Sequence, residues 1–229
     1  MFKKYPQFSF AFAIIFLAEL LAVSHDLDWL RMVSKPLITV SLMLFLRLSI
    51  KRKSKVGNRV LVGLFFSLLG DVLLMLTGLR INSFLFGLSA FLIAHLFYIV
   101  AFYLDCTKKI TIERRFPIPI IMVFAFFCIA YYMFMFPYLG NMAMPVLVYC
   151  VVISIMGIAA ALRYGKTNYK SFLWVFIGAI LFILSDSILA YNRFVEAFDA
   201  ADVMVMSTYM LAQFYITVGI VERKFVKKN

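Results

Sequence analysis

Charged residues are scarce in this chain of 229 residues. Only 15% of the residues are Asp, Glu, Lys or Arg, whereas 65% are hydrophobic. A water-soluble domain is usually close to half apolar and about one quarter charged. The composition therefore excludes a protein whose whole surface faces water, and it indicates a polytopic membrane protein.

The motifs of several enzyme classes are also missing. The sequence contains no G-x-S-x-G, no H-E-x-x-H and no glycine-rich phosphate loop, which argues against α/β-hydrolases, zincins and P-loop nucleotidases. Two histidines, His25 and His95, are too few for a zinc site built on imidazoles. The three cysteines, Cys106, Cys128 and Cys150, have neither metal-ligand nor C-x-x-C spacing, so we expect them to pack as free thiols.

Long apolar runs fill most of the chain. A helix needs about 20 apolar residues to cross the hydrocarbon core of a bilayer, and eight stretches are close to this length. The predicted fold class is therefore all-α, with eight transmembrane helices forming one bundle and a single domain over residues 1–229. The predicted spans are residues 8–24, 31–48, 59–77, 82–103, 117–136, 142–163, 169–191 and 201–221.

The first apolar run could be a signal peptide or a transmembrane helix, because lysines precede it and small residues follow it, as in a signal peptide. A glutamate, Glu19, interrupts the run. A charged residue is unsuitable for the apolar region of a signal peptide, so we expect a retained first helix.

Basic residues fall almost entirely on one side of this arrangement. If the N-terminus is cytoplasmic, all but four of the 23 Lys and Arg residues lie at the cytoplasmic side; the exceptions are Arg31, Lys35, Arg80 and Arg193. This asymmetry follows the positive-inside rule and predicts that both termini are cytoplasmic, in a cell membrane of bacterial type. Topology and contact with anionic lipid account for the net charge of +12, so no nucleic-acid partner is expected. The sequence gives no indication of the oligomeric state.

Two similar stretches suggest an internal repeat. "SLLGDVLLML" contains Asp71 and "FILSDSILAY" contains Asp186; they are followed by the similar segments "AHLFYIV" and "AQFYITV". Two four-helix halves would be related by an axis along the membrane normal, and the helices of the two aspartates would be symmetry mates. Coincidence among apolar residues is the alternative explanation.

Ionisable groups inside the predicted spans converge on one layer. Glu19, Lys35, Asp71 and Asp186 all fall in the half of the bilayer away from the cytoplasm, and His95 lies near the middle. Intramembrane charged groups normally face the interior of a bundle. We therefore predict a polar cavity inside the bundle, open toward the non-cytoplasmic side.

Helical spacing adds four polar residues to this layer: Tyr98, Asn192, Tyr209 and Gln213. Tyr209 and Gln213 are four residues apart and share a helix face, and Tyr98 lies three residues after His95. Structural roles compete with functional ones. Polar side chains such as Tyr98 or Gln213 can simply hold helices together, and His95 can be a packing residue.

Glu19 and Lys35 also have a purely structural interpretation, as a buried ion pair between neighbouring helices. Lys35 could instead extend its ammonium group to the outer headgroups. For Asp71 and Asp186 this interpretation is weaker, because neither has a cation beside it in the sequence. Two carboxylates close together in a low-dielectric site cannot easily both be ionised, so we expect a proton donor and a proton acceptor.

Several segments resemble the YhhN-like family of integral membrane proteins, the lysoplasmalogenases. They are "KPL", "FSLLGDVLLM", "FLFGLSAFLIAHLFYI", "GAILFILSDSILAYNRF" and "STYMLAQFYITVG". The resemblance implies hydrolysis of the vinyl ether bond of lysoplasmalogens to a fatty aldehyde and a glycerophospho-ethanolamine or -choline, without metal or organic cofactor. It also implies that Asp71 and Asp186 form the catalytic centre.

In such an enzyme, the other polar groups of the layer would bind the substrate. Lys35, together with Arg193, could hold the phosphate. The remaining candidates would orient the glycerol, the water or the aspartates: Glu19, His95, Tyr98, Asn192, Tyr209 and Gln213. A small proton-coupled transporter or a lipid carrier could use the same carboxylates, and a lipid-binding scaffold without chemistry is a third possibility.

Overall fold

The computed structural model describes residues 5–76, 83–107 and 117–224. Within these ranges the chain is helical and contains no β-strand. The α-helices are α1 Pro6–Ser24, α2 Asp28–Ser49, α3 Lys55–Met75, α4 Ser83–Cys106, α5 Pro117–Leu139, α6 Ala143–Ala161, α7 Tyr169–Phe194 and α8 Ala201–Val221, with a short 3₁₀ turn, η1 Gly140–Met142, between α5 and α6.

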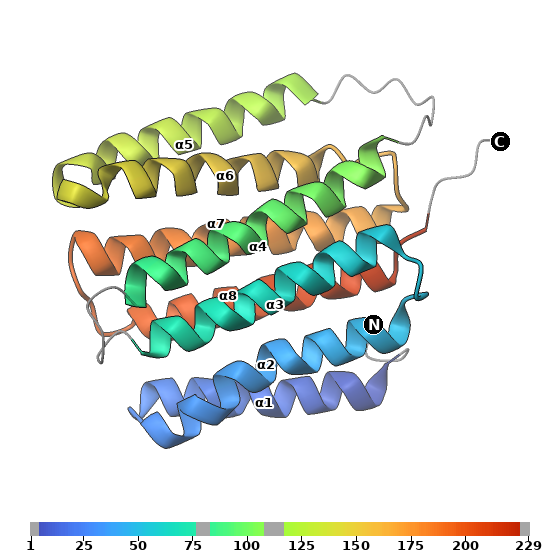
Figure 1. Ribbon diagram of the computed structural model, residues 1–229, viewed down its shortest axis with the longest axis horizontal. Coiled ribbons are helices and arrows are strands. Elements are labelled where there is room, and N and C mark those ends of the chain that lie inside the picture. Colours follow the sequence, from blue (N-terminus) through green and yellow to red (C-terminus); the bar gives the residue numbers. More distant parts are fainter. Residues whose placement is uncertain (1–4, 77–82, 108–116, 225–229) are drawn as a thin grey trace.

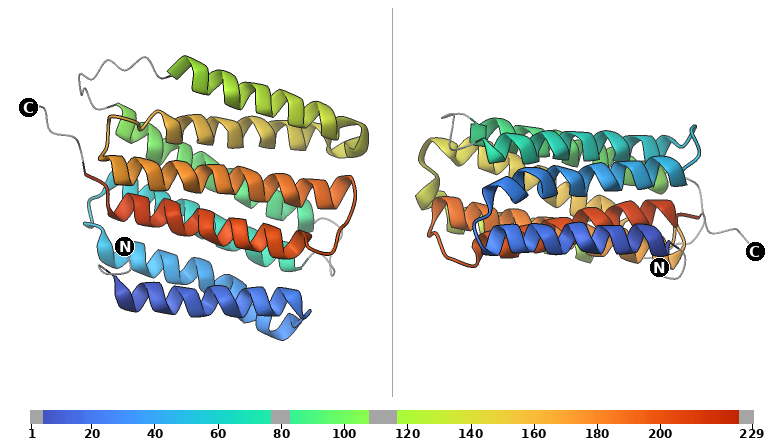
Figure 2. Two further views of the ribbon diagram at one scale, coloured as in Figure 1. Left: turned by 180° about the vertical axis from the view of Figure 1, so that it is seen from behind. Right: turned by 90° about the horizontal axis from the view of Figure 1, so that it is seen from below.

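Successive helices run back and forth across a single bundle (Figure 1), so that α1 begins and α8 ends at the same end of the molecule. The α1–α2 hairpin lies on one side and the α5–α6 hairpin on the other, with α3, α4, α7 and α8 between them (Figures 1 and 2). In the centre, α3 packs along α4 and α7 packs along α8. The structure confirms the all-helical class predicted from the sequence.

Among the residues that the structure describes, seven helical stretches are long and apolar enough to cross a membrane, and one of them covers residues 118–161. That stretch of 44 residues contains most of α5, the turn η1 and α6, which fold back on each other (Figure 1). The prediction of eight separate spans depends on dividing this stretch in two and stays a prediction, as does the orientation of the termini.

Large apolar side chains cover the outside of the bundle. Leu48 is 85% exposed, Phe126 74% and Phe10 71%. A soluble protein rarely exposes large contiguous apolar areas to water, whereas lipid makes such a surface favourable. The chain is an integral membrane protein, and its polar groups lie inside a bundle whose exterior is apolar.

The two central helices α7 and α8 approach closely where a side chain is missing. A methyl group placed on Gly178 of α7 would meet the backbone carbonyl of Ala212 and the backbone nitrogen of Ile216 in α8. Glycine therefore permits this contact between helices, in the manner of small residues at membrane helix interfaces.

A buried ion pair ties the helix ends together at the end of the bundle where α8 ends. The guanidinium of Arg163 is fully buried; its Nε donates to Asp105 Oδ2 at 3.0 Å, and its Nη2 donates to Ser171 Oγ at 2.9 Å. Arg223 donates to the other oxygen of Asp105. The topology predicted from the sequence placed Arg163 and Arg223 in basic loops. In the structure, both arginines bind the carboxylate of Asp105 at the end of α4.

Candidate active site

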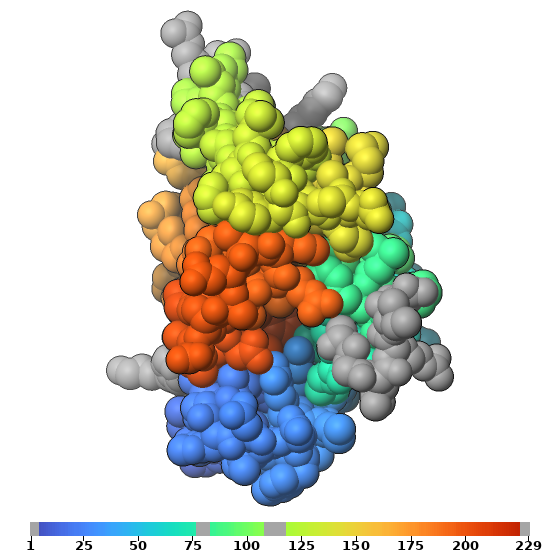
Figure 3. Space-filling view, turned by 90° about the vertical axis from the view of Figure 1, so that its left-hand side faces the viewer, coloured from blue at the N-terminus to red at the C-terminus, as the bar shows by residue number. Residues whose placement is uncertain are grey.

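A cavity of about 580 Å³ lies among α2, α3, α4, α7 and α8. It lies toward the end of the bundle opposite the ion pair of Arg163, where the surface recedes between the first two helices and the α7–α8 region (Figure 3). Its polar lining consists of Asp28, Arg31, Lys35, Asp71, Ser185, Asp186, Asn192, Arg193, Asp202 and Tyr209. A polar cavity at this level was predicted from the sequence.

Asp71 of α3 is 1% exposed and is surrounded by hydrogen-bond donors. Tyr209 of α8 donates its hydroxyl to Oδ2 at 2.7 Å, and Thr39 of α2 donates to the same oxygen at 3.2 Å. The ammonium of Lys35 lies 3.9 Å from Oδ1. These contacts favour the ionised carboxylate and oppose the cost of burying its charge.

A chain of hydrogen bonds behind the cavity fixes the Tyr209 hydroxyl. Tyr98 of α4 donates to Gln213 Oε1 at 2.7 Å, and Gln213 Nε2 donates to the Tyr209 oxygen at 3.4 Å. Tyr98 and Gln213 are fully buried and do not line the cavity. The sequence predicted that these residues orient the glycerol, the water or the aspartates; in the structure they lie behind Tyr209, the donor to Asp71.

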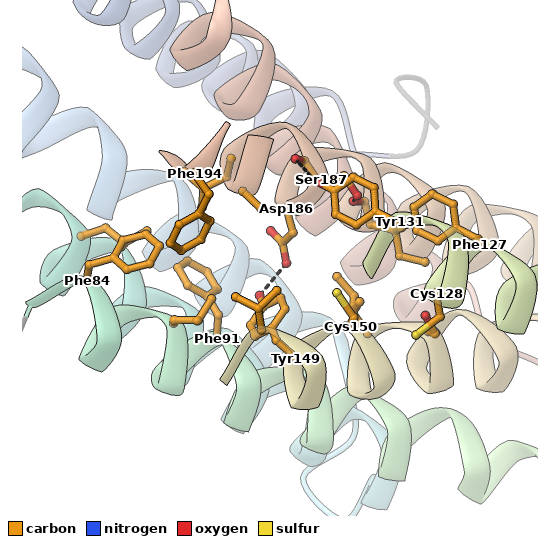
Figure 4. Close-up of a pocket in the computed structure, with 18 residues that line it drawn as sticks. Phe84, Phe91, Phe127, Cys128, Tyr131, Tyr149, Cys150, Asp186, Ser187 and Phe194 are labelled. Carbon is orange, nitrogen blue, oxygen red and sulfur yellow. Dashed lines mark hydrogen bonds between the residues drawn. The ribbon is translucent and has the colours of Figure 1, made fainter. Parts of the chain in front are cut away.

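Asp186 of α7 has a different set of partners. Tyr149 of α6 donates its hydroxyl to Oδ2 at 2.5 Å (Figure 4), and Nε2 of His95 lies 3.8 Å from the same oxygen. Neither ring nitrogen of His95 has a hydrogen-bond partner among the described residues. No Lys or Arg forms an ion pair with Asp186 in the part of the chain that the structure describes.

Glu19 lies outside the cavity lining, and its predicted role in substrate binding stays a prediction. It is fully buried in α1 and accepts a hydrogen bond from Ser34 of α2. The ion pair between Glu19 and Lys35 that the sequence suggested does not form, because Lys35 is directed toward Asp71 instead. Lys35 is 6% exposed, so it also does not extend to the membrane surface.

Asn192 and Arg193 line the cavity near the turn between α7 and α8. The side chain of Asn192 accepts a hydrogen bond from the backbone of Phe198 at 3.1 Å, which closes the turn. The guanidinium of Arg193 lies 5.0 Å above the ring of Phe84. Arg31, on the opposite wall, forms an ion pair with Asp202 at 3.1 Å.

Asp71 and Asp186 line the same cavity but do not hydrogen-bond to each other. Asp71 is held from α2 and α8, and Asp186 from α6 and α4. If α1–α4 and α5–α8 are repeats, these are equivalent pairs of helices. The pattern of contacts agrees with the predicted repeat, which nevertheless stays a prediction.

Several residues of the site were missed in the sequence: Thr39 and Tyr149, which donate to the two aspartates, and Asp28, Arg31, Ser185 and Asp202 of the cavity lining. Thr39 lies in α2 and Tyr149 in α6, two helices that the proposed repeat would make equivalent, and this is the signal that the sequence offered for these two hydroxyls. Within the described residues, no three His, Cys, Asp or Glu side chains come close enough together to hold a metal ion. The geometry is that of two separately held carboxyl groups sharing one cavity.

Comparisons with known proteins give a consistent result. A family model described as "YhhN family" matches residues 30–220. A lysoplasmalogenase of Mycobacterium bovis is 32% identical over 142 residues, which are 60% of this chain and 51% of that protein. Lysoplasmalogenase TMEM86B of Rattus norvegicus is 31% identical over 139 residues, 60% of this chain and 52% of its own.

Lysoplasmalogenase TMEM86B of Sus scrofa aligns over 227 residues at 29% identity, which covers 99% of this chain and 90% of the pig protein. The matched part of the chain thus spans about half the length of the mycobacterial and rat proteins. No solved structure matches this chain.

Proposed function

The chain belongs to the YhhN family, and from this premise we propose that it is a membrane-embedded hydrolase that cleaves the vinyl ether bond of lysoplasmalogens. The products would be a fatty aldehyde and a glycerophospho-ethanolamine or -choline. One observation carries the proposal, namely that two carboxyl groups with different partners, the buried Asp71 and the partly buried Asp186, line one cavity inside a membrane bundle. The names of the similar proteins support the choice of substrate.

The contacts suggest different roles for the two aspartates. Asp71 meets Lys35 and two hydroxyl donors, so it serves as the ionised carboxylate that accepts a proton from water. Asp186 has no lysine or arginine partner among the described residues, so a charge on it would lack a cation, which is costly inside the bundle. Asp186 therefore serves as the acid.

Vinyl ether hydrolysis can proceed between these two groups. The Asp186 carboxyl transfers its proton to the second carbon of the alkenyl chain; the π electrons form the new C–H bond, and the first carbon becomes an oxocarbenium ion. Water attacks that carbon while Asp71 takes a proton from the water, which gives a hemiacetal. Glycoside hydrolases also use two carboxyl groups, and their transition state also resembles an oxocarbenium ion.

Collapse of the hemiacetal restores both aspartates. Asp71 returns its proton to the glycerol oxygen as the C–O bond breaks, and Asp186 takes the proton of the hemiacetal hydroxyl while the aldehyde forms. The balance is one lysoplasmalogen and one water consumed, and one aldehyde and one glycerophospho compound released. Tyr149, whose hydroxyl donates to Asp186, would orient the acid, and His95 lies beside it at 3.8 Å without a hydrogen bond.

The outer part of the cavity suits a zwitterionic head group. Its lining includes two arginines, Arg31 and Arg193, and two carboxylates, Asp28 and Asp202. A phosphate can bind the arginines, and an ethanolamine or choline cation can bind the carboxylates. Lys35, deeper in the cavity, adds a cation between the head group and Asp71.

Aldehyde release from a lysoplasmalogen tests the proposal. Purified protein is incubated with lysoplasmenyl-ethanolamine, and aldehyde is measured by mass spectrometry. We expect turnover by the wild type and a loss of about 10²–10⁴-fold in Asp71→Asn and in Asp186→Asn, the usual contribution of a general acid or base. Asp199→Asn is the matched control, because this exposed aspartate lies outside the cavity lining.

Two results would reject the proposal. If the wild-type protein releases no aldehyde, the proposed hydrolase activity is rejected. Uptake of labelled lysolipid into liposomes would then favour a carrier. Turnover that survives in both aspartate variants would remove the two-carboxylate mechanism while leaving the activity in place.

A further inference from the structure

A second, apolar pocket adjoins the polar cavity on the side of α5 and α6 (Figure 4). Asp186 is the one carboxyl group among its described lining residues. Other polar atoms of the lining mostly bind within the wall: Tyr131 donates to the backbone oxygen of Ser187 at 2.6 Å, and Tyr149 donates to Asp186. Ser154 is an exception, since its hydroxyl has no partner among the described residues. Apart from Asp186 and this hydroxyl, the pocket offers a ligand mainly apolar surface.

The two spaces share part of their lining. Leu74, Phe84, Phe91 and Leu189 belong to both, and so does Asp186. A carboxyl group that faces a polar cavity on one side and an apolar pocket on the other lies at a boundary between two environments. A ligand bound across that boundary would have a polar part and an apolar part joined beside Asp186.

We infer that the apolar pocket binds the hydrocarbon chain of a single-chain ether lipid, with the ether linkage beside Asp186 and the head group in the polar cavity. The reaction and the head group rest on the proposed function, whereas the placement of the chain rests on the two linings. In a lysoplasmalogen, the vinyl ether is the point where chain and head group join. This placement brings the second carbon of the chain, which must receive the proton, to Asp186.

The size of the pocket limits what it can recognise. Its free volume is about 50 Å³, against about 580 Å³ for the polar cavity. Because the apolar pocket is the smaller of the two spaces, we expect it to hold the first carbons of the chain, with the rest extending along the apolar exterior of the bundle. The pocket therefore selects for an unbranched chain next to the ether, and the total chain length has little effect.

Photo-crosslinking tests the placement without requiring turnover. The probe is a 1-O-alkyl lysophosphoethanolamine, a saturated ether that cannot follow the vinyl ether route, with a diazirine on the third carbon of its chain. After irradiation of the full chain in liposomes, peptide mass spectrometry locates the label. We expect it on residues 127–154 and 183–194, which form the walls from α5, α6 and α7, or on Leu88 of α4, which lines only the apolar pocket. Label confined to α1, α2 or α8 would overturn the inference.

A pair of matched variants adds a test of the pocket wall. Val146 lines the pocket and is 5% exposed, whereas Val148 on the same helix is 46% exposed and lies outside the lining. A phenyl ring at position 146 occupies the free space, so Val146→Phe should reduce labelling at least tenfold and Val148→Phe should not. Equal labelling in the two variants would overturn the inference.

These outcomes separate the inference from the proposed function. If the wild type is labelled at the predicted walls but releases no aldehyde from lysoplasmalogen, the chain site stands and the proposed reaction fails. If aldehyde is released but the label lies elsewhere, the reaction stands and the chain site fails. Should Val146→Phe not fold, the wild-type labelling pattern decides alone.

Discussion

Removing the hydroxyl of Tyr209 should slow the reaction without unfolding the protein. This hydroxyl is the closest donor to Asp71, at 2.7 Å, and it is buried among the helices. A hydrogen bond to a charged group contributes about 1.5–3 kcal/mol. Since about 1.4 kcal/mol corresponds to a tenfold change in rate, Tyr209→Phe should lower kcat by roughly 10- to 100-fold.

The remaining contacts set the upper limit of this loss. Thr39 and Lys35 still face Asp71 in the variant, so the carboxylate keeps part of its stabilisation and the effect should be smaller than that of Asp71→Asn. The assay is aldehyde release under saturating lysoplasmalogen, together with the thermal unfolding midpoint in detergent. Tyr215→Phe is the control, because Tyr215 lies on the same helix but stacks on Trp174, at 5.0 Å between ring centres.

Two outcomes would refute this reasoning. If Tyr209→Phe turns over as fast as Tyr215→Phe, the hydrogen bond to Asp71 has no role in the reaction. If the rate falls only in proportion to the amount of folded protein, the hydroxyl is a structural element alone.

Three further changes give distinct expectations. Arg163→Met leaves the buried carboxylate of Asp105 with one partner fewer and should lower the free energy of unfolding by about 3–5 kcal/mol. Lys170→Met, at an exposed site, should not change it. Equal thermal unfolding midpoints for the two variants would contradict the role of the buried ion pair. Gly178→Ala forces a methyl group against the backbone of α8 and should cost about 1–3 kcal/mol of stability, which an unchanged midpoint would disprove. Glu19→Gln should leave turnover close to that of the wild type, because this side chain lies outside the cavity; a loss as large as that of Asp71→Asn would return Glu19 to the site.

Apolar length made the helices predictable, because each predicted span overlaps one α-helix of the structure. The charge of a residue, in contrast, did not reveal its surroundings. Arg163 follows an apolar helix like any other loop cation, yet its guanidinium is buried against Asp105. Such a pairing joins residues 58 positions apart, and no local pattern specifies it.

Because polar residues are rare in the apolar helices, they indicated which residues lie at the level of the cavity. They did not indicate which side chains contact each other. Lys35, Asp71, Asp186, Asn192 and Tyr209 do line the cavity, as the shared layer predicted. The depth of a residue in the membrane says little about the direction in which it points.

Direction is set by helix rotation and packing, which the sequence pattern does not specify. Glu19 turns toward Ser34 at the α1–α2 contact. Tyr98 and Gln213 form a hydrogen bond behind the cavity, and Thr39 and Tyr149 were missed because a single hydroxyl is unremarkable in an apolar helix.

The unequal roles of the two aspartates can be tested most directly by rescue with formate. Formate is ionised at neutral pH, so it can replace a missing carboxylate base but not a missing acid. We predict that added formate raises aldehyde release by Asp71→Ala by about tenfold or more and leaves Asp186→Ala inactive. Rescue of Asp186→Ala with no rescue of Asp71→Ala would contradict the assignment of acid and base.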